Sequence, residues 1–152
     1  MDTAHIEKWV NRWRQHEKDA YHILTKPSPV LLTTAYAQDV VNGYQIANEW
    51  VKRACQRHLK DLKRSKEDPD YMWRFDEKKA YRPIKFIEKK TVASKGDARH
   101  LVMQPWQHFF IGCIFVWLHK ETGVRRFREA LLFLGRKNGK TTVESGLADY
   151  TV

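Results

Sequence analysis

Eight consecutive residues near the C-terminus have the types and the spacing that bind nucleotide phosphates. They directly follow the apolar run 129–134 and read Gly135-Arg136-Lys137-Asn138-Gly139-Lys140-Thr141-Thr142. Gly139 lets the backbone curl close to phosphate oxygens, and the N–H groups that open the next helix point at them. Lys140 supplies a positive charge for the β- and γ-phosphates, the Thr141 hydroxyl is a ligand for Mg²⁺, and Thr142 can reach an α-phosphate. These residues predict a site for a nucleotide with Mg²⁺.

The loop departs from the common phosphate-binding pattern by one residue. That pattern has a glycine five residues before the glycine of Gly-Lys, and Leu134 occupies this position. Gly135 comes one place later, so the loop reads G-x-x-x-G-K-T. The alternative is an accidental glycine turn with basic residues. It would require the preceding apolar run, the threonine pair and the flanking arginines to coincide by chance.

Two elements must position this loop. The run 129–134 is short and almost wholly apolar, which predicts a strand of a parallel sheet buried on both faces. Residues 143–150 then predict a helix. Trp106 to Lys120 predicts a buried helix that stops at Gly123.

The rest of the chain is predicted to be largely helical. Apolar residues recur at helical spacing over about 3–24 and again over 47–62, with a break predicted at Gly43. Pro27 and Pro29 predict a loop between these helices. Residues 63–79 predict an exposed connection with aromatic anchors, and Pro83 predicts the start or a kink of a further helix around 80–87. Residues 91–100 predict a surface loop.

Composition limits the class of protein. The 152 residues carry 28 Lys+Arg and 18 Asp+Glu, a formal charge of +10, and 42% are hydrophobic, which favours a folded basic protein. A cluster of basic residues predicts a polyanion as partner, either nucleic acid or a nucleotide phosphate. It comprises Arg125, Arg126, Arg128, Arg136, Lys137 and Lys140. The longest apolar run, 109–118, is about half of the roughly 20 residues that cross a bilayer, so no membrane partner is expected.

The two cysteines, Cys55 and Cys113, lie far apart among apolar neighbours, which favours reduced core thiols of a cytosolic protein. Cys55 and His58 share one helix face. No second pair with metal-ligand spacing accompanies them in the sequence, so core packing is favoured over metal binding.

Several segments together resemble the ATPase motor of the large terminase subunit of tailed bacteriophages. The runs 125–130 and 136–141 resemble its deviant phosphate loop, in which an arginine follows the small residue that opens the loop. Pro105-Trp106-Gln107 before an apolar helix resembles its adenine-recognition motif. Residues 39–43 and 50–62 resemble the N-terminal helices of one terminase branch. The resemblance covers about residues 35–145.

The resemblance implies roles for particular residues. Lys140 and Thr141 would bind the triphosphate and Mg²⁺, Gln107 would hold adenine, and Arg136 would contact the γ-phosphate during transfer. It implies ATP and Mg²⁺ as cofactors, with Lys140 and Arg136 as catalytic residues. The full set of binding residues would be Gln107, Gly135, Arg136, Lys137, Asn138, Gly139, Lys140, Thr141 and Thr142. Without the resemblance, composition favours Gln107 as a surface polar residue beside a buried Trp106 and Lys137 as a solvated loop charge, and it fits Arg136 equally well as a solvated or a catalytic charge.

The resemblance also implies partners and an architecture. The partners would be double-stranded DNA, the small terminase subunit and the portal protein, in the cytoplasm of a phage-infected or prophage-carrying bacterium. The expected fold is an incomplete α/β P-loop type. It has a helical, basic region over 1–100 and the start of an ATPase domain over 101–152, with one strand, the phosphate loop and a helix.

Hydrolysis by such a motor also needs an apolar strand that ends in an acid. Glu144 and Asp149 lie instead on the helix that follows the loop. We therefore expect an N-terminal portion of a large terminase that binds ATP but lacks the hydrolytic acid and the nuclease domain, and is inactive alone. Two alternatives are a basic helical DNA-binding or adaptor module and a small-molecule kinase.

Overall fold

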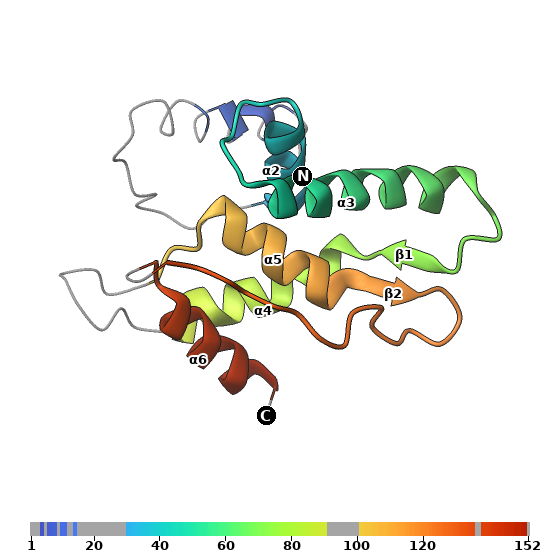
Figure 1. Cartoon of the computed structure of the whole chain (residues 1–152). Helices are drawn as coiled ribbons and strands as arrows, with labels where there is room; N and C mark the ends of the chain where they lie inside the picture. The colour runs from blue at the N-terminus through green and yellow to red at the C-terminus, as the bar shows by residue number, and fades with distance from the viewer. Residues whose placement is uncertain are drawn as a thin grey trace.

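The part of the chain that the structure describes is predominantly helical, with one small antiparallel sheet (Figure 1). The computed structural model describes residues 4, 6–8, 10, 11, 14, 30–90, 101–135 and 138–151. In chain order the elements are α2 (Thr33–Val41), α3 (Glu49–Glu67), β1 (Trp73–Phe75), α4 (Glu77–Lys90), α5 (Pro105–Val116), β2 (Trp117–His119) and α6 (Lys140–Thr151). None of the described helices combines the length and apolar composition that a membrane-spanning helix needs.

Little of the predicted N-terminal helix over 3–24 can be compared with the structure. Its described residues are helical, and Arg14 forms an ion pair with Asp39 of α2 at 2.8 Å. The remaining positions of that helix, the proline-containing loop at 27–29 and the loop 91–100 lie outside the described residues.

Helices α2 and α3 form where apolar residues recur at helical spacing. α2 ends just before Gly43, which confirms the predicted break. At the start of α3, the Asn48 side chain accepts a hydrogen bond from Val51 N at 2.9 Å, satisfying an N–H that has no partner within the helix. Cys55 and His58 face inward, as expected for one apolar stripe.

The connection between α3 and α4 contains more structure than predicted. Trp73–Phe75 forms strand β1, and Tyr71 just before it is buried. The aromatic residues therefore anchor this segment as expected, but through a strand pairing that the mixed charges of residues 63–79 concealed. Pro83 lies inside α4 rather than at its start, with Ile84 and Ile87 buried on the same helix.

The predicted helix from Trp106 to Lys120 is wrong at its C-terminal end. α5 stops at Val116, and Trp117–His119 extends as β2, pairing antiparallel with β1 in the register Trp73↔His119 and Phe75↔Trp117. The continuous apolar run fits a buried helix and a buried strand equally well. Backbone groups on β1, more than forty residues earlier in the sequence, decide between them.

The prediction of a strand over 129–134 is also wrong. The segment is extended, but none of the described residues pairs with it as a strand, and Leu131 and Phe133 are 91% and 92% exposed. In the view of Figure 1 it passes in front of α4 and α5 on its way to α6. The buried parallel sheet implied by its composition needs neighbouring strands, and the strands present among the described residues, β1 and β2, form a small antiparallel sheet without it.

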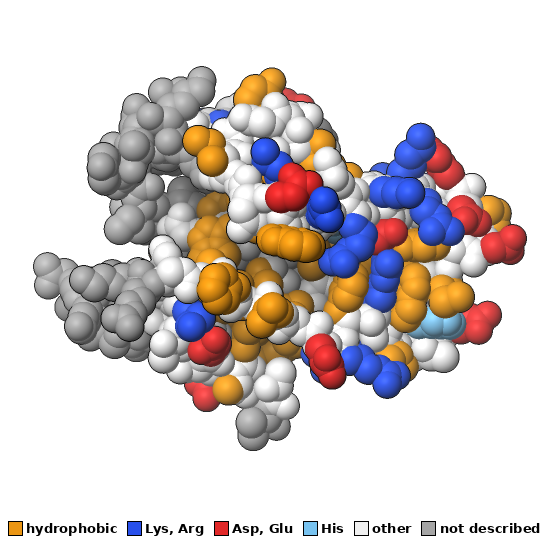
Figure 2. Space-filling view, in the orientation of Figure 1, with side chains coloured by type: hydrophobic (Ala, Val, Ile, Leu, Met, Phe, Trp, Pro, Cys, Tyr) orange, Lys and Arg blue, Asp and Glu red, His pale blue; other side chains and the backbone are white. Residues whose placement is uncertain are grey.

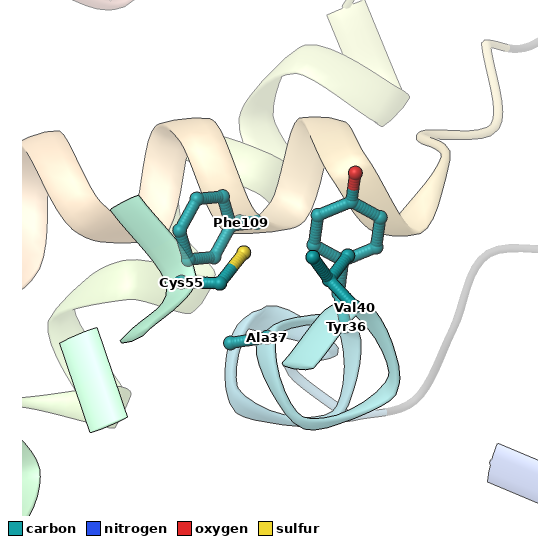
Figure 3. Close-up of a cluster of buried hydrophobic side chains, with 5 residues drawn as sticks. All are labelled: Tyr36, Ala37, Val40, Cys55 and Phe109. Carbon is teal, nitrogen blue, oxygen red and sulfur yellow. The ribbon is translucent and has the colours of Figure 1, made fainter. Parts of the chain in front are cut away.

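Two apolar clusters hold the helices together. The first joins α2, α3 and α5 through Tyr36, Ala37, Val40, Cys55 and Phe109 (Figure 3). The second joins α4, the segment before α5, α5 itself and α6 through Ile84, Ile87, Met103, Ile111 and Val143. α5 belongs to both clusters, which explains why it is apolar on all sides.

Polar contacts also tie α5 to the start of α2. The Thr33 hydroxyl donates to the His108 carbonyl at 2.8 Å, and Leu32 N donates to His108 Nδ1 at 3.3 Å. Burial lowers the pKa of His108 to about 3, so its imidazole is neutral at pH 7 and can accept at Nδ1. These bonds fix α5, and with it Gln107, against α2.

Arg126 connects α3 to the segment that leads to the phosphate loop. Its Nη1 atom donates to Asp61 Oδ2 at 2.6 Å and to the Tyr71 hydroxyl at 2.8 Å, and its guanidinium lies 5.1 Å from the Phe127 ring centroid. Asp61 is 6% exposed. Arg126 was predicted as part of a polyanion-binding cluster, but its charge is already neutralised by Asp61.

We expect Arg126→Ala to destabilise the fold by about 2–4 kcal/mol, because it leaves the buried Asp61 carboxylate without its partner. Arg128→Ala is the matched control, since Arg128 is exposed and an exposed substitution costs within about 0.5 kcal/mol. Urea unfolding followed by tryptophan fluorescence measures both variants. Equal midpoints for the two variants would contradict the structural role of Arg126.

Candidate nucleotide-binding site

The glycine turn and the helix after it are present as the sequence predicts. Gly139 has a φ of +69°, a backbone conformation that favours glycine, and α6 begins at the next residue, Lys140. Val143 N donates to the Gly139 carbonyl at 3.1 Å, which closes the first helical turn. The Asn138 side chain donates to the Gly135 carbonyl at 3.4 Å across the loop. The turn is therefore held by its own residues.

The groups predicted to contact phosphate and Mg²⁺ face outward at the start of α6. Lys140 and Thr141 are exposed and Thr142 is half-buried. The Thr141 hydroxyl has no hydrogen bond to any described residue, so this oxygen is available to a metal ion. The first N–H groups of a helix also lack intrahelical partners and favour anions. Arg136 and Lys137 lie outside the described residues, and their roles stay predictions.

The opposite side of α6 is anchored in the core. Val143 is fully buried in the second apolar cluster, and the Tyr150 ring lies 5.5 Å from Phe86 of α4 and 5.6 Å from Phe115 of α5 between ring centroids. The helix that starts at the loop is thus fixed to α4 and α5. Its N-terminus has a defined position relative to the start of α5.

Gln107 lies in the first turn of α5 and is buried, at 5% exposed. Its Oε1 atom accepts a hydrogen bond at 2.6 Å from the backbone N–H of Gln104, the residue that caps the helix. Because an N–H can only donate, the atom facing Gln104 must be the amide oxygen, so the amide nitrogen points elsewhere. The interpretation of Gln107 as a solvated surface residue is therefore wrong.

The amide nitrogen of Gln107 faces the phosphate loop. A Cβ atom placed on Gly139 would lie 3.9 Å from Gln107 Nε2, which is ordinary van der Waals contact. The start of α5 and the start of α6 therefore meet, although the sequence separates them by about thirty residues. This is the arrangement expected if one ligand contacts both.

Glu88 is a residue of this region that the sequence did not single out. It is 4% exposed, and its Oε1 atom accepts a hydrogen bond from Met103 N at 3.1 Å, next to Gln104. Burial raises the pKa of Glu88 to about 7, while the Met103 N–H and the charge of Lys85 act in the opposite direction. A signal was present, because Glu88 lies four residues after Ile84 on the apolar face of α4.

The buried histidine and thiols of α3 and α5 form a packing cluster rather than a second site. Trp117 Nε1 donates to His58 Nδ1 at 3.2 Å, and Cys113 Sγ lies 3.8 Å from the same nitrogen. Burial lowers the pKa of His58 to about 4 and raises the pKa of the Cys113 thiol to about 12, so neither is charged at pH 7. Over the described part of the chain, no three His, Cys, Asp or Glu side chains are placed to share a metal ion.

Residues 105–151 match the family model described as terminase large subunit, ATPase domain. The match begins at the first residue of α5 and ends with α6, so it includes Gln107 and the whole phosphate loop. It confirms the resemblance to the terminase large subunit over this segment and supports nucleotide use within a packaging motor in general. No curated protein and no solved structure matches the chain.

We expect Gly139→Ala to weaken ATP–Mg²⁺ binding at least tenfold, because a Cβ at a positive φ distorts the turn that presents the loop amides. Gly123→Ala is the matched control. Gly123 has the same φ of +69° and open space around it, but lies in the turn after β2. Both variants should lose about 1 kcal/mol of stability in thermal unfolding. Equal ATP affinity in the two variants would contradict the site.

Proposed function

We propose that this chain supplies the ATP–Mg²⁺-binding part of a phage DNA-packaging motor of the terminase large subunit type. The observation that carries the proposal is the meeting of Gln107 at the start of α5 with Gly139 just before α6. A nucleotide is a ligand with a base at one end and phosphates at the other. The start of α5 carries the Gln107 amide, which suits the base. The start of α6 carries the glycine turn and Lys140, which suit the phosphates.

Each residue has a definable task in this site. The amides at the start of α6 and Lys140 hold the β- and γ-phosphates, and Lys140 offsets the charge that develops on the transferred group. The Thr141 hydroxyl would be a ligand for Mg²⁺, which would neutralise negative charge on the phosphates. Gln107 donates to the adenine base, and Thr142 contacts the α-phosphate. Arg136, at the γ-phosphate, and Lys137 complete the proposed set.

Hydrolysis requires a carboxylate that orients the attacking water. Among the described residues that follow the loop, Glu144 and Asp149 are both exposed on α6. We propose that neither of these two carboxylates orients the attacking water, so that this chain alone binds ATP without turning it over. The same proposal includes the small terminase subunit and the portal protein as partners and the host cytoplasm as location.

We expect Lys140→Ala to weaken ATP–Mg²⁺ binding by about 10- to 100-fold in isothermal titration calorimetry of the full chain, because it removes the charge facing the phosphates. Lys66→Ala is the control, since Lys66 is exposed near the end of α3, away from α6 (Figure 1). The proposal fails if wild-type chain shows no saturable ATP binding, or if both variants bind ATP equally. Turnover that disappears in Lys140→Ala would contradict the inactive state proposed for the chain alone.

A second candidate function, binding of duplex DNA, is favoured by the surface of α3. Four basic residues at spacings of four, three and four form one face of this helix, the α3 basic stripe: Arg53, Arg57, Lys60 and Arg64. Blue side chains gather over α3 in Figure 2. At about 1.5 Å per residue the stripe is about 16 Å long, which covers several phosphates of a duplex.

Aromatic rings support three of these side chains. The guanidinium groups lie 5.4 Å from the Trp50 ring centroid for Arg53, 4.9 Å from Phe127 for Arg57 and 4.5 Å from Tyr71 for Arg64. Such stacking orders a long side chain. Arg53 and Arg64 also form ion pairs, with Glu49 at 3.0 Å and with Asp68 at 3.3 Å, so part of their charge is already compensated. A preordered row of guanidinium groups suits a phosphate backbone.

We expect the double variant Arg57→Ala, Lys60→Ala to bind duplex DNA at least tenfold more weakly and to lower the log–log salt slope by about 2, one for each lost phosphate contact. Lys78→Ala, Lys79→Ala is the control, with two exposed lysines removed from α4. Fluorescence anisotropy at several salt concentrations measures both. Equal losses in the two double variants would show that net charge, rather than the α3 basic stripe, determines DNA binding.

A further inference from the structure

A row of hydrogen bonds leads from α4 to the side chain of Gln107. Glu88 Oε1 accepts from Met103 N at 3.1 Å, and Gln104 N, the next N–H along the chain, donates to Gln107 Oε1 at 2.6 Å. Glu88 and Gln107 are 4% and 5% exposed, and Met103 is fully buried. The orientation of the Gln107 amide is therefore determined by protein contacts rather than by water.

The contact between Glu88 and Met103 anchors the peptide bond before the one whose N–H orients Gln107. Met103 is held on both sides, by its side chain in the second apolar cluster and by its N–H on Glu88. Because Met103 is fixed, the backbone N–H of Gln104 points in one direction, and Gln107 Oε1 accepts a hydrogen bond from it. The amide nitrogen of Gln107 then points toward Gly139.

We propose that Glu88 is a positioning residue for nucleobase selection, acting through Met103 and Gln104 to turn the Gln107 amide toward the nucleotide. Gln107 reads adenine by donating from Nε2 to a ring nitrogen and by accepting at Oε1 from the exocyclic amine. Apart from Gln104 N, no described residue donates to Oε1, so a second lone pair is available. A rotated amide would present the wrong group to each of these atoms. The inference rests on the proposed ATP site, and it adds the residue that determines selectivity for the base.

Helix α4 is suited to this task because it also supports the phosphate loop. Phe86 of α4 contacts Tyr150 of α6, and Ile84 and Ile87 pack with Val143 in the second apolar cluster. One helix thus holds the start of α5 through Glu88 and holds α6 through its apolar side chains. A change at Glu88 alone should disturb the base end of the site and leave the phosphate end in place.

The test compares ATP with inorganic tripolyphosphate, which has the phosphates and no base. Calorimetry of the full chain with Mg²⁺ gives both affinities and their ratio. We expect wild-type chain to prefer ATP by about tenfold or more, Gln107→Ala to lose this preference, and Glu88→Met to lose it to a similar degree. Met has nearly the volume of Glu but accepts no hydrogen bond from Met103 N. Glu88→Gln keeps an acceptor and should restore the preference.

The double variant Glu88→Met, Gln107→Ala should lose no more preference for ATP than Gln107→Ala alone, because Glu88 acts only through the Gln107 side chain. A purely structural role of Glu88 would weaken both ligands together and leave their ratio at the wild-type value, which overturns the proposal. If Glu88→Met does not fold by circular dichroism, Glu88→Asp, which withdraws the acceptor by one methylene, replaces it. Wild-type chain that binds neither ligand refutes the ATP site itself, whereas ATP bound with no preference over tripolyphosphate refutes only base selection.

Discussion

The second apolar cluster is the contact on which the candidate site depends. Ile84 and Ile87 of α4, Met103, Ile111 of α5 and Val143 of α6 are all fully buried in it. Burial of one such side chain contributes about 1.5–3 kcal/mol, so the five together oppose strongly any separation of these helices. Because Met103 lies just before α5 and Val143 is in the first turn of α6, the same cluster determines how the two helix starts face each other.

α5 connects the first apolar cluster to the second. Its Phe109 packs with α2 and α3 in the first apolar cluster, and its Ile111 packs with α4 and α6 in the second. In Figure 1 it lies between α3 and α4. A ligand at the start of α5 would therefore contact a helix that packs, through Phe109, with the apolar residues of α2 and α3.

Local features of the site could be predicted from the sequence, because they depend on neighbouring residues. The glycine turn at Gly139, the helix after it and the break at Gly43 follow from residue types at fixed spacing. The exposed positions of Lys140 and Thr141 follow from the same motif. Gln107 came from a resemblance rather than from its own neighbours, and its burial was not foreseen.

Features that depend on distant residues could not be predicted. Arg126 pairs with Asp61, which lies sixty-five positions away in the sequence. The residues next to Arg126 in the sequence therefore do not distinguish it from the other arginines of its cluster. Trp117–His119 becomes a strand because β1 supplies its partner, whereas none of the described residues pairs with 129–134 as a strand. The domain boundary placed at residue 100 stays a prediction.

In the proposed motor, the starts of α5 and α6 form a single site for ATP–Mg²⁺. Hydrogen–deuterium exchange of the full chain, with and without ATP–Mg²⁺, tests it most directly, because it reports the amides of both segments in one experiment. We expect slower exchange in residues 104–108 and 138–143 together, at the same ATP concentration. Protection limited to one of these segments, or found only on α3, would contradict a shared site.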